Sequence, residues 1–173
     1  MRELIIRDAR PGDRDAIVNV TLTAYEQYAA VMKTHWDGYR QNIVSTLDDV
    51  TPAAQVVAEM DGVIVGTVLL YPAGMVFTAP NGSSITTAAP EVRLLAVAPV
   101  ARGHGVGGAL MRECIRRARQ SGAAALTLHT TEMMAVALRM YERMGFIRVP
   151  ELDFHPAKNI TIKGYRLDLT EAA

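Results

Sequence analysis

Apolar residues along this chain follow two spacings, and the spacing changes at glycines, prolines and short polar stretches. Short, nearly continuous apolar runs between such breaks are typical of strands whose faces are covered. Apolar residues that return every three or four positions indicate a helix with one buried face. The expected strands are Glu3–Arg7, Gln55–Met60, Val63–Tyr71, Glu91–Ala98, Ala125–Thr130, Phe146–Val149 and Ile160–Leu169.

Helical spacing fills several of the segments between these strands. Proline is favoured in the first turn of a helix, so Pro11 is a suitable start for the first one. Glycine often follows the last helical residue, so Gly145 is a suitable end for the last one. The expected helices run from Pro11 to about Ala30, from Arg40 to Leu47, from near Gly105 to Gln120 and from Met133 to Met144.

The connections differ in how clearly they can be interpreted. Asp61 and Gly62 stand between two apolar runs, and this pair is favoured in two-residue β-hairpins. Lys33–Tyr39 and Pro150–Asn159 read as loops. The turn-rich segment Pro72–Pro90 predicts an irregular excursion.

The resulting order is β-α-α-β-β-β-α-β-α-β-β. It predicts an α/β fold in which an antiparallel meander leads into a parallel crossover. We therefore expect a central mixed, mostly antiparallel sheet flanked by helices. A chain of 173 residues fits a single domain, which we expect to span residues 1–173.

Composition limits the partners. Half of the residues are hydrophobic and 21% are charged, which argues against disorder. Lys and Arg together number 18, as do Asp and Glu, so the formal charge is zero. Nucleic acids and anionic membranes attract strongly basic surfaces, and we expect neither to be the main partner.

The single cysteine, Cys114, excludes an internal disulfide and suits a reducing compartment. It falls on the apolar face of its expected helix, where a buried structural thiol is the expected role. The first apolar run is too short for a signal peptide, and no run approaches a membrane span, so we expect a cytoplasmic protein. The histidines show no metal-ligand spacing, and no metal is expected.

A glycine-rich loop follows the apolar strand Glu91–Ala98. Pro99 cannot donate to a strand ladder, so pairing should stop there. Glycines stand at 103, 105, 107 and 108, and helical spacing begins directly afterwards. The first amides of a helix lack intrahelical partners and lie at the positive end of its dipole, and glycine lets a ligand approach them. The segment therefore predicts a phosphate-binding site, with a simple tight turn as the alternative.

Two nucleotide-binding interpretations fail on context. Gly103, Gly105 and Gly108 spell G-x-G-x-x-G, but a dinucleotide site needs an acidic residue at the end of the next strand, and His129 stands there. A P-loop needs Lys followed by Ser or Thr after its glycines, and that pair is absent from this loop.

Arg102, Gly105 and Gly107 match Q/R-x-x-G-x-G/A, the motif of the GNAT superfamily of acyl-CoA-dependent N-acyltransferases. A second segment matches the family's A-x-x-x-Y-x-x-x-G-F through Ala137, Tyr141 and Gly145-Phe146. The two motifs stand in the family's order, and so do the expected elements. The chain resembles this superfamily from about Leu4 to Leu169.

The resemblance implies acetyl-CoA as co-substrate. It implies that the backbone N–H of Leu95 holds the thioester oxygen, that Val97 pairs with the pantetheine arm, and that Ala96 and Ala137 also contact the cofactor. The family often has an asparagine that contacts pantetheine where this chain has Met134, so that contact is lost or supplied by another group. The pyrophosphate would be held by Arg102, Gly103, His104, Gly105, Val106, Gly107 and Gly108.

Tyr141 corresponds to the family's general acid toward the thiolate leaving group; packing of its ring between helix and sheet is the alternative and is compatible with that role. Glu91 stands where several members keep a catalytic glutamate. If apolar neighbours cover it, burial would raise its pKa and suit it to accept a proton from the amine. The alternatives are an exposed glutamate at a strand end, a water relay, or deprotonation in bulk solvent.

The acceptor is expected to be a primary amine of a small molecule or peptide. The segments Val31–Tyr39 and Pro150–Asn159 correspond to acceptor loops but carry no recognisable signature. Tyr28, Trp36 and Tyr39 are either packing aromatics or the walls of an amine pocket. A homodimer is possible, because many members of the superfamily pair. The alternative function is a non-catalytic acyl-CoA sensor.

Overall fold

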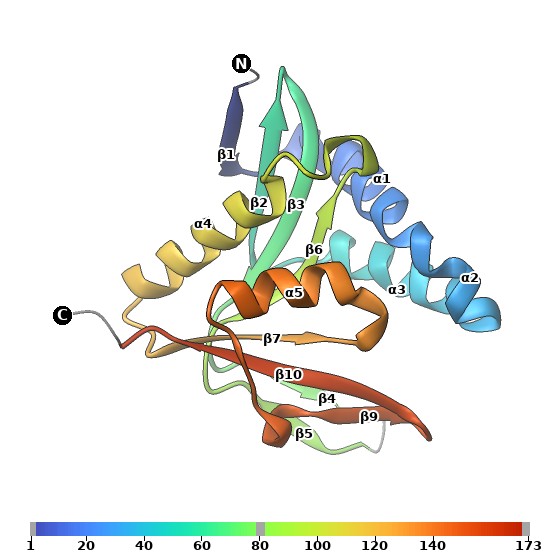
Figure 1. The fold of residues 1–173 in the computed structure, drawn as a ribbon, viewed down its shortest axis with the longest axis vertical. Coiled ribbons are helices and arrows are strands. Elements are labelled where there is room, and N and C mark those ends of the chain that lie inside the picture. Colours follow the sequence, from blue (N-terminus) through green and yellow to red (C-terminus); the bar gives the residue numbers. More distant parts are fainter. Residues whose placement is uncertain (1–2, 79–81, 171–173) are drawn as a thin grey trace. The chain divides into compact units, whose positions relative to one another are not determined.

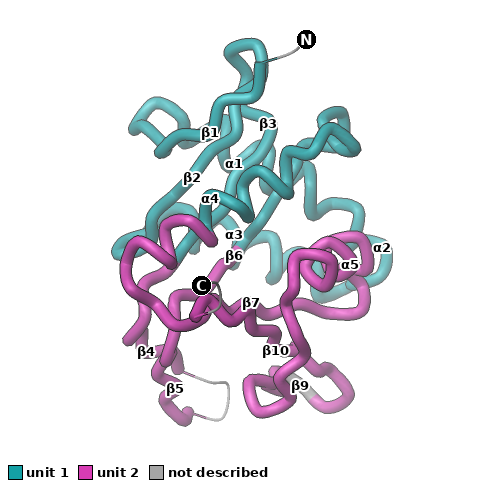
Figure 2. The backbone as a smooth tube through the Cα atoms, turned by 60° about the vertical axis from the view of Figure 1, so that its left-hand side comes forward, with its two compact units in different colours: residues 1–70, 94–114 teal, residues 71–93, 115–173 magenta. Residues whose placement is uncertain are grey.

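The structure is a computed structural model that describes residues 3–78 and 82–170. The chain divides into two compact units (Figure 2). Unit 1 contains residues 1–70 and 94–114, and unit 2 contains residues 71–93 and 115–173. Strand β6 (Glu91–Val97) is divided between them after Arg93.

Unit 1 is built on strands β1 (Leu4–Asp8), β2 (Ala54–Met60) and β3 (Val63–Tyr71, whose last residue belongs to unit 2), with the second part of β6 next to β3. β1 and β3 both pair antiparallel with β2. The β2–β3 turn has positive φ at Asp61 (52°) and Gly62 (78°), as the predicted two-residue hairpin requires. The helices of this unit are α1 (Arg14–Tyr25), α2 (Ala29–Met32), α3 (Trp36–Asp48) and the first part of α4 (Val106–Gln120).

Gly66 of β3 brings sheet and helix together in unit 1. A Cβ atom at Gly66 would lie 2.8 Å from Cγ1 of Val106 and 3.2 Å from the carbonyl oxygen of Ala96. Only glycine leaves room for the start of α4 to pack this closely on β3, and Figure 1 shows α4 lying against β2 and β3. The glycine therefore helps to fix where α4 begins relative to the strands.

Unit 2 contains the first part of β6, β7 (Ala125–Thr130), β8 (Ile147–Arg148), β9 (Phe154–Ala157) and β10 (Ile160–Asp168). β6 pairs parallel with β7, at Glu91↔Thr127 and Val92↔Leu128. β10 pairs antiparallel with β7, β8 and β9. A separate hairpin of β4 (Val76–Thr78) and β5 (Ser84–Thr86) belongs to the same unit.

Helix α5 (Ala135–Arg143) runs beside β7 in Figure 1. Its end is stabilised by Gly145, at φ 95°, because the amide of Phe146 donates to the carbonyl of Tyr141 and that of Gly145 to the carbonyl of Glu142. A Cβ at Gly145 would lie 3.3 Å from Cδ1 of Leu167 in β10. The predicted glycine stop thus also permits a close approach to the sheet.

The predicted fold class is confirmed: β1–β2, β2–β3 and β7–β10 pair antiparallel, β6–β7 pairs parallel, and helices accompany the strands. Three local predictions were wrong. The expected loop Lys33–Tyr39 is largely helical, since α3 begins at Trp36 and places Tyr39, Ile43 and Leu47 along one face. The expected irregular excursion holds the β4–β5 hairpin, and the loop Pro150–Asn159 holds β9. In the part of the chain that the structure describes, every helix is too short or too polar to cross a bilayer.

Candidate functional site

The predicted phosphate loop lies in unit 1, directly before α4. Gly103 and Gly105 have φ values of 78° and 77°, in the left-handed region that favours glycine. The first amide that closes a turn of α4 is that of Ala109, which donates to the carbonyl of Gly105 at 3.0 Å. The preceding amides, from Val106 to Gly108, belong to the first turn of the helix and have no partner within it. Together with the helix dipole, they form a group of donors suited to an anion.

Arg102 is tied to the end of α1. Its Nη2 atom donates to the carbonyl of Ala24 at 3.1 Å, across 78 residues of sequence. Its own carbonyl lies 2.9 Å from Nδ1 of the exposed His104. Both side chains are exposed at the loop, so a positive guanidinium group stands in the same short segment as the glycine amides.

Strand β6 has an unusual backbone in its middle. Leu94 has φ 50°, a left-handed conformation that a leucine rarely adopts. The next carbonyl, that of Leu95, accepts a hydrogen bond from the hydroxyl of Tyr25 at 3.2 Å. Directly after β6, the amide of Ala98 donates to the carbonyl of Val65 in β3 at 2.8 Å. The predicted cofactor strand Leu95–Val97 therefore lies between a backbone irregularity and a backbone hydrogen bond to β3.

Tyr141 lies in α5 of unit 2 and is 7% exposed. Its ring packs edge-on against Phe146, with 5.9 Å between centroids. This agrees with the packing role considered for the tyrosine, which does not compete with a role for its hydroxyl. Ala137 stands one turn earlier on α5 and is half-buried.

Glu91 is buried, with 3% of its surface exposed, so of the two alternatives it is not the exposed glutamate at a strand end. The rise in pKa that burial alone would cause is not found. Burial does raise the pKa of this carboxyl, but hydrogen bonds and positive charge from His129 and Arg93 outweigh it and hold the pKa below its ordinary value. Both partners contact the same oxygen, Oε1, from 2.9 Å (Arg93 Nε) and 3.2 Å (His129 Nδ1).

His129 bridges Glu91 and a loop carbonyl within unit 2. Its Nε2 atom lies 2.8 Å from the carbonyl oxygen of Leu152, which can only accept. The ionised carboxylate of Glu91 on Nδ1 can also only accept, so this geometry favours the doubly protonated ring. Burial lowers the pKa of His129, but the contacts with Glu91 and Leu152 outweigh it and the pKa is raised.

The guanidinium group of Arg93 lies over two aromatic rings of unit 2. Its Cζ atom is 3.8 Å from the ring centroid of Phe77 and 5.4 Å from that of Tyr71. A cation over a ring face is attracted by the ring quadrupole. Arg93 therefore links the Glu91 carboxylate to the β4–β5 hairpin.

Two hydroxyls at the carboxyl end of β7 stand out. Among the described residues, Thr130 and Thr131 have buried Oγ1 atoms for which the chain supplies no hydrogen-bond partner. Such atoms are uncommon, since a buried polar atom without a partner is costly. They come shortly before Met134, where the family's asparagine is missing.

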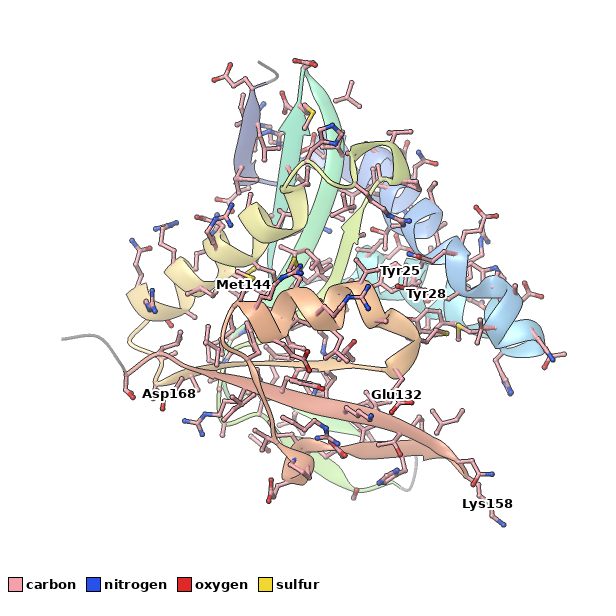
Figure 3. All side chains as sticks on the ribbon, in the orientation of Figure 1. Tyr25, Tyr28, Glu132, Met144, Lys158 and Asp168 are labelled. Atoms are coloured by element: carbon pink, nitrogen blue, oxygen red, sulfur yellow. The ribbon has the colours of Figure 1, made fainter. Side chains whose placement is uncertain are left out.

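The aromatic residues of the first helical segments pack on one another. Tyr25 contacts Tyr28 and Tyr39, with ring centroids 5.9 and 6.1 Å apart, and Trp36 lies 6.2 Å from Tyr39. Figure 3 shows Tyr25 and Tyr28 near each other at the end of α1. Burial raises the pKa of Tyr39 to about 12, and the nearby Tyr28 adds to this. These contacts fit the packing interpretation.

Cys114 is fully buried, as predicted. In the described ranges, no three His, Cys, Asp or Glu side chains form a group that could hold a metal ion.

Residues 19–146 match the model of the acetyltransferase (GNAT) family. This chain belongs to that family. Among curated proteins, it is 29% identical over 170 residues to mycothiol acetyltransferase of Parafrankia sp. (strain EAN1pec), covering 83% of this chain. The chain spans about half (53%) of that relative's length.

Solved structures show the same fold. A GNAT-family acetyltransferase from Staphylococcus aureus Mu50 aligns with a TM-score of 0.73 and 14% identity, over 97% of this chain and all of the other. A GNAT-family acetyltransferase from Brucella melitensis in complex with acetyl-CoA aligns with a TM-score of 0.62 and 24% identity, over 100% of this chain and 92% of the other.

Sequence reasoning missed the contacts of three side chains at the candidate site. From sequence, His129 was placed only at a strand end, and no role was assigned to Arg93 or Tyr25. Two of the contacts are distant in sequence, His129 and Glu91 being 38 positions apart and Tyr25 and Leu95 being 70 apart. The alternation of charge in Glu91-Val92-Arg93 was the one local signal, since it places both charged side chains on the same face of a strand.

Proposed function

We propose that this chain is an acetyl-CoA-dependent N-acetyltransferase that moves an acetyl group to a primary amine. The observation that supports it most is the segment Arg102–Gly108, where two left-handed glycines precede helix amides without intrahelical partners. This is a site for the diphosphate of coenzyme A. The acetyl-CoA complex of the Brucella melitensis relative supports the cofactor. We further propose that residues 1–173 act as one domain.

The transfer proceeds by direct attack, without a covalent enzyme intermediate. The neutral amine nitrogen attacks the thioester carbonyl carbon, and the backbone N–H of Leu95 stabilises the negative charge that develops on its oxygen. The carbon–sulfur bond then breaks, and the Tyr141 hydroxyl donates its proton to the leaving thiolate. The pantetheine arm is contacted by the backbone of Ala96 and Val97 and by Ala137.

Glu91 is the proposed acceptor of the proton that the attacking amine loses. The lowered pKa keeps its carboxylate ionised at neutral pH, so it is in the right protonation state but is a weak base. A water relay or bulk deprotonation can take the same proton, and the kinetics of a Glu91 variant separate these routes. The unpartnered hydroxyl of Thr131 is our proposed replacement for the family's asparagine, because it offers both a donor and an acceptor.

The proposed acceptor is a small molecule, in keeping with the name of the mycothiol acetyltransferase relative. The test is thiol release from acetyl-CoA with a panel of amines, polyamines, aminoglycosides and peptide N-termini, with mass detection of the product. We expect one class of small amine to give acetylated product. Tight coenzyme A binding without turnover on any acceptor would instead support the non-catalytic sensor. Size-exclusion chromatography of the same sample tests whether the chain forms a homodimer.

A further inference from the structure

The end of α1 holds two segments of unit 1 to which the proposed function assigns roles. Tyr25, the last residue of α1, contacts Leu95 of β6, and the preceding Ala24 contacts Arg102 of the glycine loop. We propose that Tyr25 is a positioning residue for acetyl transfer: its hydroxyl fixes the backbone of β6 that presents an amide to the thioester oxygen. This inference rests on the proposed function and adds a residue outside both family motifs.

The end of α1 is suited to this task because its last carbonyls lack the regular hydrogen-bond partners of a helix. α1 gives way to a 3-10 turn at Glu26–Tyr28, so regular bonding to the last carbonyls of α1 stops. The carbonyl of Ala24 is then used by Arg102 at 3.1 Å and by Gln27 Nε2 at 2.8 Å. A cation at a helix carboxyl end is also favoured by the dipole. The end of α1 is thereby fixed to the loop, and Tyr25 with it.

The contact of Tyr25 lies next to an unfavourable backbone conformation in β6. Leu94, at φ 50°, holds a left-handed conformation that is sterically unfavourable for a leucine. Such a conformation persists only where surrounding contacts determine it. The Tyr25 hydroxyl binds the very next carbonyl, that of Leu95, from a side chain that is itself only 7% exposed.

The position of this carbonyl matters for the amide assigned to the reaction. The N–H and C=O groups of Leu95 stand on either side of its Cα atom, so fixing the carbonyl restricts rotation about ψ of Leu95. The left-handed conformation of Leu94 sets the orientation of the peptide group that carries the Leu95 N–H. An amide that stabilises a developing oxyanion must be in place before the reaction, because reorientation during the reaction costs rate. Losing the hydroxyl should therefore affect the transition state more than cofactor binding.

Packing gives Tyr25 a second role that the test must separate. Its ring contacts Tyr28 and Tyr39, and Tyr25→Phe keeps the ring while removing the hydroxyl. Tyr165→Phe is the matched control, because Tyr165 is also buried, at 5% exposure, but lies on β10 in the other unit and has no role in the proposed site. A purely structural hydroxyl would lower the melting temperature without a selective effect on turnover.

The experiment combines kinetics with hydrogen exchange on the full chain. For Tyr25→Phe we expect kcat to fall about three- to tenfold, the effect of one lost hydrogen bond, with KM for acetyl-CoA changed less than about twofold. We also expect amide exchange in the peptide covering Leu94–Ala98 to rise at least about threefold, since the held strand is loosened. Tyr165→Phe should show neither effect.

Unchanged kcat, or unchanged exchange in Leu94–Ala98, overturns the role of Tyr25. An equal loss in kcat for Tyr165→Phe also overturns it, because the effect would then be one of general stability. If the wild-type chain acetylates no amine, the proposed function fails and the catalytic part of this inference fails with it. The exchange measurement remains a separate test of the Tyr25–Leu95 contact.

Discussion

Glu91 and His129 form a partly buried ion pair, with Nδ1 of His129 3.2 Å from Oε1 of Glu91. The histidine's other nitrogen is occupied by the carbonyl of Leu152. His129 thus connects the strand that carries Glu91 to the segment between β8 and β9. Because both of its partners accept hydrogen bonds, the charged ring is the stable form, and this makes the pair sensitive to pH.

The pair should stabilise unit 2 most in mildly acidic solution. The pKa of His129 is raised above its ordinary 6.5, so its contribution is fully present below about pH 6.5 and is lost as the pH rises through the raised value. The pKa of Glu91 is lowered below its ordinary 4.5, so its contribution is present above that pH and is lost as the pH falls through the lowered value.

We therefore expect His129→Gln to lower the free energy of unfolding by about 1.5–3 kcal/mol near pH 5.5, because a charge-assisted hydrogen bond is lost. Near pH 9 the penalty should be smaller, since less of the wild-type ring is protonated there. Urea denaturation at both pH values measures it. His35→Gln, at an exposed position, is the control. A penalty that is equal at both pH values would contradict the charged pair.

Replacing Glu91 tests the proposed base. Glu91→Gln leaves Arg93 and His129 without their shared carboxylate, so we expect stability to fall together with turnover. If Glu91 is the base, kcat should fall at least about 100-fold in protein that remains folded by circular dichroism. A loss of less than about threefold assigns proton removal to water.

In either case the acidic limb of the wild-type pH profile should follow the pKa of the acceptor amine, since Glu91 stays ionised well below neutrality.

Tyr141→Phe tests the proposed general acid. The ring and its contact with Phe146 are preserved, so stability should change by less than about 1 kcal/mol. We expect kcat to fall by about 100-fold, while the Kd for coenzyme A from calorimetry changes less than about twofold. Tyr165→Phe again serves as control. Equal turnover in the variant and the wild type would remove Tyr141 from the mechanism.

Gly105→Ala tests the phosphate loop. No atom lies within 4 Å of the place a Cβ would take, so the cost is that of a left-handed alanine at φ 77°, about 1 kcal/mol. Relief of that strain would turn the loop amides away from the diphosphate, and we expect coenzyme A to bind at least about tenfold more weakly. Gly12→Ala, which also meets no atom within 4 Å and has an ordinary φ, should bind coenzyme A like the wild type.

Local rules predicted the elements that are set by a few neighbouring residues. The Asp61-Gly62 turn and the glycine stop after α5 need only the backbone freedom of glycine or a short polar side chain. The strand, loop and helix around Arg102–Gly108 could also be predicted, because each of these elements has its own residue preferences. These features were enough to identify the family and to place the proposed phosphate loop.

The errors and omissions have physical causes. The start of α3 was missed because Gly38 is unfavourable inside a helix, although Trp36, Tyr39 and Ile43 already share a helical face. The β4–β5 strands are three residues each, too short to show alternation.

The direction of the Glu91 pKa shift was missed for a different reason. Burial alone raises a carboxyl pKa, and the two cations that reverse the effect meet Glu91 only in the folded chain. The same holds for Tyr25, whose contact with Leu95 spans 70 residues.

The proposed function depends above all on the amides of Val106, Gly107 and Gly108, which we propose bind the diphosphate of coenzyme A. A crystal structure of the full chain soaked with excess coenzyme A tests this directly. We expect diphosphate oxygens about 2.7–3.2 Å from these backbone nitrogens. Density for the diphosphate elsewhere, or a loop closed by its own side chains under saturating cofactor, would contradict it.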